Sequence, residues 1–194
     1  MQICKVNVFL LQYRGYGRSQ GQSPHHPGLQ QDSQAGLNYL LSDPRIDITR
    51  LFILGHSLGG AVSLDLVSRN PGIFAGLILD NTFKSIRQVA IDLMPPFGWL
   101  TAFEDLEPWD NEARVKEIYD KGFIPMLAIL GGRDELFPQD HMLTLYHTAH
   151  TLSSHKDSIR LAFFPNGTHI HTSREPHYAE TICDFIQETL QIKI

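Results

Sequence analysis

The chain has 194 residues, of which 42% are hydrophobic and 19% are charged, and its formal net charge is −5. These values exclude a disordered chain and a disulfide miniprotein, because a single domain of this length buries enough surface to build its own core. The acidic balance argues against a nucleic-acid-binding protein, which presents a basic face. No apolar run approaches the roughly 18 residues of a membrane-spanning helix.

The two cysteines, Cys4 and Cys183, are too few and too far apart in the sequence for a metal site or a disulfide framework. We interpret them as buried free thiols, the usual state of unpaired cysteine. The apolar run that follows Met1 is too short for a signal peptide and leads directly into a predicted strand. We therefore expect the chain as written to be cytoplasmic.

Apolar runs and helical spacing alternate along the chain. Five short apolar runs with turn residues on both sides predict strands at residues 6–13, 51–55, 74–80, 124–130 and 160–165. Between them, apolar residues at helical spacing predict helices at 29–41, 57–69 and 139–149 and a last helix that starts near residue 176. Strands that alternate with helices indicate an α/β fold with a mostly parallel sheet and flanking helices.

The stretch 82–121 breaks this alternation. It carries no strand pattern, but it is rich in apolar and aromatic residues, among them Trp99 and Trp109. We interpret it as a helical cap inserted into a single domain of residues 1–194, lying over one edge of the sheet. The alternative is ordinary core and loop packing.

Residues 55–60, Gly-His-Ser-Leu-Gly-Gly, stand between a predicted strand and a predicted helix. This is the G-x-S-x-G pattern in the context that an exposed catalytic serine requires. Ser57 would sit on a sharp turn with its hydroxyl above the sheet, and Gly55 and Gly59 would be glycines because side chains there would collide with the neighbouring strand or helix. The helix N-terminus would direct partial positive charge at the reacting oxygen, and the Leu58 N–H is predicted to donate to an oxyanion.

A serine becomes a nucleophile only with a base and an orienting acid, which follow it in the order acid, then histidine, in this arrangement. Asp134 follows the strand at 124–130 and His169 follows the strand at 160–165, so both lie at the edge where the parallel strands end. We predict that His169 takes the Ser57 proton while Asp134 holds the other ring nitrogen. Glu135 and His171 are the alternatives to Asp134 and His169.

Together these motifs resemble the serine α/β-hydrolases. Tyr-Arg-Gly-Tyr-Gly-Arg-Ser at 13–19, the serine turn, Asn-Thr-Phe at 81–83 and Phe-Pro-Asn-Gly-Thr-His at 164–169 are similar to the α/β-hydrolase domain-containing protein 13 family over nearly the whole chain. The resemblance implies Ser57 as nucleophile, Asp134 as acid and His169 as base, and a structural role for the turn at 14–17. We expect no cofactor and no metal.

The resemblance also marks what this chain lacks. Members of that family begin with a membrane-anchoring segment, three strands and a histidine-glycine loop that supplies the second oxyanion donor, and Met1 falls at the start of their fourth strand. The chain therefore resembles an N-terminally shortened form without the first strands. The segment 6–13 would then pair directly with 51–55 or lie on a sheet edge, and only the turn at 13–17 could move in as a second donor. A longer form with its anchor would be membrane-associated.

These observations predict a serine hydrolase that cleaves an ester, thioester or other acyl bond through an acyl-enzyme on Ser57. The apolar cap favours a small-molecule, lipid-like acyl substrate, because ligand pockets are mostly apolar. A peptidase of the same fold is the alternative within the enzymes. Outside them, the alternative is a truncated hydrolase-like protein without catalytic activity.

Overall fold

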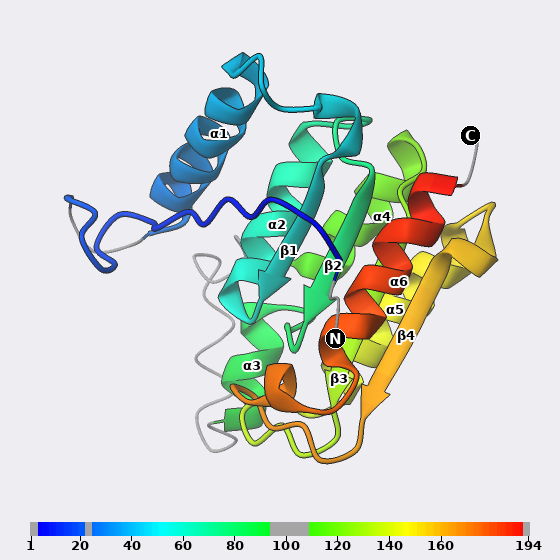
Figure 1. The fold of residues 1–194 in the computed structure, drawn as a ribbon. Helices are drawn as coiled ribbons and strands as arrows, with labels where there is room; N and C mark the ends of the chain where they lie inside the picture. The colour runs from blue at the N-terminus through cyan, green and yellow to red at the C-terminus, as the bar shows by residue number, and fades with distance from the viewer. Residues whose placement is uncertain (1–3, 22–24, 94–108, 192–194) are drawn as a thin grey trace.

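The computed structural model describes residues 4–21, 25–93 and 109–191. Among these residues, parallel strands form one sheet in chain order, and they are β1 (Phe52–His56), β2 (Gly76–Asp80), β3 (Met126–Gly131) and β4 (Ile159–Phe164). All of them therefore end at the same edge of the sheet, the lower edge in Figure 1. The structure thus confirms the parallel sheet and the strands predicted at 51–55, 74–80, 124–130 and 160–165.

Helices flank this sheet on both faces (Figure 1). They are α1 (His26–Ser42), α2 (Leu58–Arg69), α3 (Ile86–Leu93), α4 (Asn111–Lys121), α5 (Asp140–Leu152) and α6 (Tyr178–Gln191), with 3₁₀ turns at Ile48–Arg50, Lys156–Ser158 and Thr172–Arg174. Behind the sheet, α4 packs against both α2 and α5, α1 packs beside α2, and α6 lies in front. In the part of the chain that the structure describes, no helix has the length and hydropathy needed to cross a membrane.

The side chains of β2 and β3 build a core on both faces of the sheet. Leu77 and Leu79 are 0% exposed and belong to the cluster formed with α2, α4 and α5. Ile78 and Leu127 point to the opposite face, where Phe185 of α6 covers them. Because successive side chains of a strand point to opposite faces, burial on both faces explains why these strands are apolar at consecutive positions.

The segment 6–13 is not a strand, so this prediction was wrong. It runs as irregular chain in front of β2 and β1 toward α1 (Figure 1), and Val8 and Leu10 are 73% and 85% exposed. The segment is fastened to α6 through Cys4 and to α1 through the Arg14–Asp32 ion pair. Because these attachments lie on either side of β1, the segment crosses the strands and forms no ladder with them. It therefore neither pairs with 51–55 nor forms an edge strand.

The expectation of two free thiols was also wrong. Cys4 and Cys183 form a disulfide, with their Cα atoms 5.3 Å apart. That separation lies in the usual range for disulfides. The two residues meet because the N-terminal segment crosses to α6, an arrangement that the distance between them in the sequence does not reveal.

The stretch 82–121 divides into parts with different roles. Helix α4 is the crossover between β2 and β3, and its residues Val115 and Ile118 are buried in the same cluster as Leu77 and Leu79. This part therefore belongs to the core, as the alternative interpretation holds, and not to a cap. Helix α3 lies near the edge where the strands end (Figure 1). Residues 94–108 lie outside the described residues, so a cap there stays a prediction.

Candidate active site

Ser57 stands on the turn between β1 and α2, as the sequence predicts. Its backbone has φ 53° and ψ −123°, a conformation that a residue other than glycine rarely adopts. The turn is held by hydrogen bonds at both ends of the serine: its N–H donates to the carbonyl oxygen of Asp80 at 3.0 Å, and its own carbonyl oxygen accepts from the Thr82 hydroxyl at 2.7 Å. These bonds hold the strained turn in place at the edge of the sheet.

The glycines around Ser57 have different reasons to be glycine. A Cβ on Gly55 would lie 2.3 Å from the carbonyl oxygen of Gly59, and a Cβ on Gly60 would lie 2.5 Å from the hydroxyl of Thr82. A Cβ on Gly59, in contrast, would have no described atom within 4 Å. The expectation that a side chain would collide is therefore right for Gly55 and wrong for Gly59, which lies on a side of α2 that the described residues leave open.

The structure brings the three predicted residues together. His169 Nε2 lies 2.9 Å from Ser57 Oγ, and His169 Nδ1 lies 2.9 Å from Asp134 Oδ2. The side chains of His169 and Asp134 are only 4% and 2% exposed. The histidine ring therefore connects the serine hydroxyl to a buried carboxylate.

Asp134 is held as a carboxylate in this arrangement. Burial by itself would raise the pKa of Asp134, but hydrogen bonds from the His169 ring and from the backbone N–H groups of Phe137 and Leu136 hold that pKa below its ordinary value. An ionised Asp134 accepts the proton on His169 Nδ1. The lone pair on Nε2 then faces the Ser57 hydroxyl, which is the tautomer that a general base requires.

The two alternative residues lie elsewhere. His171 is exposed, and its backbone N–H donates to the Thr168 hydroxyl at the start of a 3₁₀ turn. Glu135 is exposed too, and its carboxylate accepts the backbone N–H of His169 at 3.0 Å rather than the ring. This bond lowers the pKa of Glu135. Neither side chain replaces His169 or Asp134 in the chain of hydrogen bonds to Ser57.

The N–H of Leu58, the predicted oxyanion donor, belongs to the first turn of α2. Leu58 is the first residue of α2, and the first N–H groups of a helix have no acceptor within the helix. The turn at 13–17, named above as the segment that could move in as a second donor, has contacts of its own. The N–H of Tyr16 donates to the carbonyl oxygen of Tyr13, and the N–H of Arg14 donates to Asp32.

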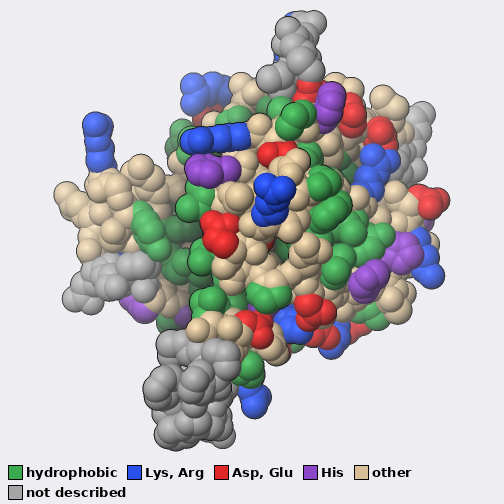
Figure 2. Space-filling view, turned by 90° about the horizontal axis from the view of Figure 1, so that it is seen from below, with side chains coloured by type: hydrophobic (Ala, Val, Ile, Leu, Met, Phe, Trp, Pro, Cys, Tyr) green, Lys and Arg blue, Asp and Glu red, His purple; other side chains and the backbone are tan. Residues whose placement is uncertain are grey.

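Aromatic rings line one side of the group formed by Ser57, His169 and Asp134, which is called the triad below. The rings of Phe137 and His169 are nearly perpendicular, at 89°, with their centroids 4.9 Å apart, and the ring centroids of Phe83 and Phe137 lie 5.4 Å apart. Both phenylalanines belong to an apolar cluster that includes Trp109 and the first turns of α2. Figure 2 looks onto this edge of the sheet and shows hydrophobic side chains spread across it, with acidic, basic and histidine side chains among them.

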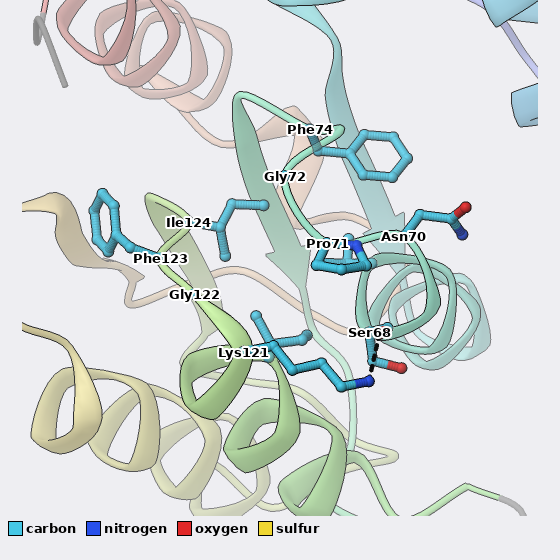
Figure 3. Close-up of a pocket in the computed structure, with 11 residues that line it drawn as sticks. Ser68, Asn70, Pro71, Gly72, Phe74, Lys121, Gly122, Phe123 and Ile124 are labelled. Carbon is cyan, nitrogen blue, oxygen red and sulfur yellow. Dashed lines mark hydrogen bonds between the residues drawn. The ribbon is translucent and has the colours of Figure 1, made fainter.

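A cavity of about 250 Å³ lies away from this site. It is lined by the C-terminal ends of α2 and α4 and by the residues that precede β2 and β3, at the edge where the strands begin (Figure 3). Lys121 reaches over it and donates to the carbonyl oxygen of Ser68 at 3.1 Å. None of its lining residues belongs to the triad. The described residues contain no group of His, Cys, Asp and Glu side chains that could hold a metal ion.

Sequence reasoning missed several residues beneath the triad. Asp80 ends β2 and is 4% exposed, and Tyr178 donates to its carboxylate at 2.8 Å. Burial raises the pKa of Asp80, and the Tyr178 hydrogen bond opposes this rise. Asn81 follows it, and His56 precedes Ser57; both donate to the backbone of His169. The positions of His56, Asp80 and Asn81 in the sequence could have indicated them, because each stands at or directly after the end of a strand, on the same edge of the sheet as the triad.

Comparison with known proteins places these motifs in one family. The model of the prolyl oligopeptidase family matches residues 18–193. Protein bem46 of Schizosaccharomyces pombe is 34% identical over 183 residues, which are 94% of this chain and 58% of that protein. The α/β hydrolase domain-containing protein WAV2 of Arabidopsis thaliana is 37% identical over 183 residues, with 89% and 57% covered. The chain thus spans less than two thirds of the length of these curated relatives.

Solved structures agree on the fold. An esterase of Pyrococcus furiosus, Pf2001, superimposes with a TM-score of 0.69 at 17% identity, over 91% of this chain and 68% of that one. The acylaminoacyl peptidase of Pyrococcus horikoshii superimposes with a TM-score of 0.67 at 20% identity, over 85% and 28%. Both structural comparisons show a similar arrangement of strands and helices. The match to the family model shows similarity of sequence as well. The chain therefore belongs to the prolyl oligopeptidase family and has the α/β-hydrolase fold.

Proposed function

We propose that this chain is a serine hydrolase in which Ser57 is the nucleophile, His169 the general base and Asp134 the residue that orients the base. The observation that supports this most directly is the pair of 2.9 Å contacts that connect Ser57 Oγ to His169 and His169 to Asp134. The strained turn at Ser57 and the position of α2 behind it support the same assignment.

These contacts support the following reaction. Ser57 Oγ attacks the acyl carbon while His169 Nε2 takes its proton, and Asp134 stabilises the imidazolium that forms. The Leu58 N–H and the N-terminus of α2 face the negative charge that develops on the acyl oxygen. His169 then gives its proton to the leaving group, which departs and leaves the acyl group on Ser57. Water attacks this ester with His169 again as base, and the acid and the free Ser57 hydroxyl are released.

The proposed substrate is an ester, thioester or related acyl compound with an apolar acyl group. The aromatic side chains of Phe83 and Phe137 beside His169, and Ile170, which is 65% exposed, support an apolar partner. A peptidase is the second candidate, because the matching family is named for an oligopeptidase and one structure of similar fold is that of an acylaminoacyl peptidase.

A panel of substrates tests this proposal. The purified chain is given p-nitrophenyl esters of short and medium acyl chains, a thioester with the same acyl groups, and an N-acyl-aminoacyl p-nitroanilide. We expect the esters and the thioester to be cleaved, with an acyl group on Ser57 detected by mass spectrometry, and Ser57→Ala to lose both signals. Faster cleavage of the anilide would favour the peptidase. If no substrate were cleaved and Ser57 were never acylated, the non-catalytic alternative would stand.

A further inference from the structure

His169 lies in the loop after β4, yet its backbone is held by side chains from the ends of the other strands. Its N–H donates to Glu135, which comes after β3, at 3.0 Å. Its carbonyl oxygen accepts from His56 Nε2 at 2.7 Å and from Asn81 Nδ2 at 3.2 Å. The position of the ring therefore depends on contacts that reach the loop from β1, β2 and β3.

Asn81 makes the most extensive of these contacts. Its side-chain oxygen accepts the N–H of Gly131 at 2.8 Å, and its amide nitrogen donates to Thr172 Oγ1 at 2.9 Å and to the carbonyl oxygens of Thr168 and His169 at 3.2 Å each. The surroundings of Asn81 thus require a hydrogen-bond acceptor on one side of the side chain and a pair of N–H donors on the other. A carboxamide provides both. Because an amide flip would place its N–H groups against another N–H, these neighbours fix its orientation.

The backbone at Asn81 is adapted to this task. Its φ is 42°, in the left-handed region that asparagine tolerates better than most residues. Its own N–H donates to the carbonyl oxygen of Ile129 in β3 at 3.1 Å, and the residue is 1% exposed. Backbone and side chain together join the end of β2 to the end of β3, and from there to the loop of His169.

The loops on both sides of this amide are packed without spare room. A Cβ on Gly131 would lie 2.6 Å from Thr172 Oγ1 and 2.7 Å from the carbonyl oxygen of Gly167. A Cβ on Gly167 would lie 2.5 Å from Thr172 Oγ1. Because the loop of His169 touches the chain that leads to Asp134 this closely, a shift at Asn81 is passed to both residues.

We propose that Asn81 is a positioning residue that sets the place of His169 relative to Ser57 and Asp134. The proposal rests on the proposed function of these three residues. Asn81 touches no reacting atom, and it acts through the two chain segments that it joins. Removing its donor pair leaves the carbonyl oxygen of Thr168 without that partner and lets the loop move, whereas the Ser57 turn keeps its own bonds to Asp80 and Thr82.

The test compares Asn81→Asp and Asn81→Ala with the matched control Asn111→Ala. Asp keeps the size of Asn81 but turns the donor pair into an oxygen that faces the carbonyl oxygens of Thr168 and His169. Asn111 is 0% exposed and donates to the carbonyl oxygen of Phe83 at 2.7 Å, so the control loses a buried amide hydrogen bond that does not reach the His169 loop.

The first measurement does not depend on catalysis. The proton shared by His169 Nδ1 and Asp134 gives a downfield proton NMR signal, which His169→Gln assigns. The second measurement is the rate constant for labelling of Ser57 by a fluorophosphonate probe. We expect both Asn81 variants to lose or shift the His169 signal and to be labelled about tenfold more slowly or worse, because small displacements of reacting groups are costly. Asn111→Ala should keep the signal and be labelled within about twofold of the unmodified chain, because Asn111 donates to the backbone of Phe83 and not to the loop of His169.

The two measurements separate the two claims. If the unmodified chain is not labelled, the proposed function fails, while the NMR signal still decides the role of Asn81. An Asn81 variant that is folded and keeps the His169 signal unchanged would overturn the positioning role. If neither Asn81 variant folds, Thr172→Val decides, because it removes only the hydroxyl that accepts from Asn81 and donates to Thr168. We expect a shifted His169 signal in that variant, and an unchanged one would overturn the proposal.

Discussion

His169 Nε2 lies 2.9 Å from Ser57 Oγ, although 112 positions of sequence separate the two residues. The contact exists because each residue follows a strand, and the two strands end at the same edge of one parallel sheet. A shared edge, rather than nearness in sequence, is what collects the candidate catalytic groups.

Exchanging the acid tests the assignment of Asp134. Asp134→Asn keeps the shape of the side chain but donates toward His169 Nδ1, so the ring adopts the tautomer that cannot take the Ser57 proton. By the precedent of serine proteases, we expect the rate constant for Ser57 acylation to fall by roughly 10⁴. Stopped-flow measurement with an activated ester would record this change.

Glu135→Gln is the matched control for that exchange. It removes a charge that accepts the backbone N–H groups of His169 and of Glu135 itself and makes no contact with the His169 ring. We expect a loss below about tenfold, in the range of one exposed hydrogen bond. A severe loss in Glu135→Gln together with a mild one in Asp134→Asn would exchange the roles of the two acids.

The serine turn offers a second matched pair. Gly55→Ala places a Cβ 2.3 Å from the carbonyl oxygen of Gly59, so we expect it to lower the free energy of unfolding by about 3 kcal/mol or to prevent folding. Gly59→Ala meets no described atom within 4 Å and stands in the first turn of α2, so we expect it to stabilise by less than the roughly 0.5–1 kcal/mol gained in the middle of a helix. Urea unfolding of both variants would measure the difference. Equal destabilisation by both variants would contradict the close approach of Gly55 in β1 to the backbone of Gly59 in α2.

Asp80 gives stability a dependence on pH. Burial raises its pKa above the ordinary 3.8, so the folded chain binds more protons than the unfolded chain. The free energy of unfolding then falls as pH rises from the unfolded pKa to the folded one. Asp80→Asn removes this titration, and we expect its stability relative to the unmodified chain to increase with pH across that window and to stay constant above it.

Urea unfolding at a series of pH values tests this sign. Tyr178→Phe is the companion variant, because it removes the hydrogen bond that opposes the rise of the Asp80 pKa. We expect it to extend the window toward higher pH. A relative stability of Asp80→Asn that decreases with rising pH would mean that the pKa of Asp80 is lowered.

The disulfide between Cys4 and Cys183 makes stability depend on reductant. It closes nearly the whole chain into a loop, and disulfides stabilise by about 2–5 kcal/mol. We expect a phosphine reductant to lower the urea midpoint of the unmodified chain and to open the segment 6–13 to proteases. The Cys4→Ser, Cys183→Ser double variant should have the same urea midpoint and the same protease digestion with and without reductant. If the reductant changed neither the urea midpoint nor the protease digestion of the unmodified chain, this prediction would be refuted.

The sequence could predict the elements whose pattern reflects their own surroundings. Strands β2 and β3 are apolar at consecutive positions because both faces are buried, and position 55 before Ser57 is a glycine because β1 and α2 nearly touch there. The run at 6–13 has the same apolar pattern, but a strand also needs a partner for its backbone. The attachments of that segment to α6 and α1 lead it across β1 instead.

The residues that hold the site were harder to predict. Asn81 follows a strand, as Asp134 and His169 do, but its backbone partners lie at the end of β3 and in the loop after β4, and these two segments meet only once the sheet has formed. Nothing in the spacing of these segments signals that contact. For the same reason, the pairing of Cys4 with Cys183 is visible only once the path of the N-terminal segment is known.

Covalent labelling of Ser57 tests the central claim most directly. The purified chain, Ser57→Ala and His169→Gln are each incubated with a fluorophosphonate probe, and intact mass and peptide mapping locate the adduct. We predict one probe per chain, attached to Ser57, with no adduct in Ser57→Ala and a rate lower by a factor of about 10³ or more in His169→Gln, since the base is needed to activate the serine. Labelling that leaves Ser57 untouched, or that proceeds equally well without His169, would contradict the account.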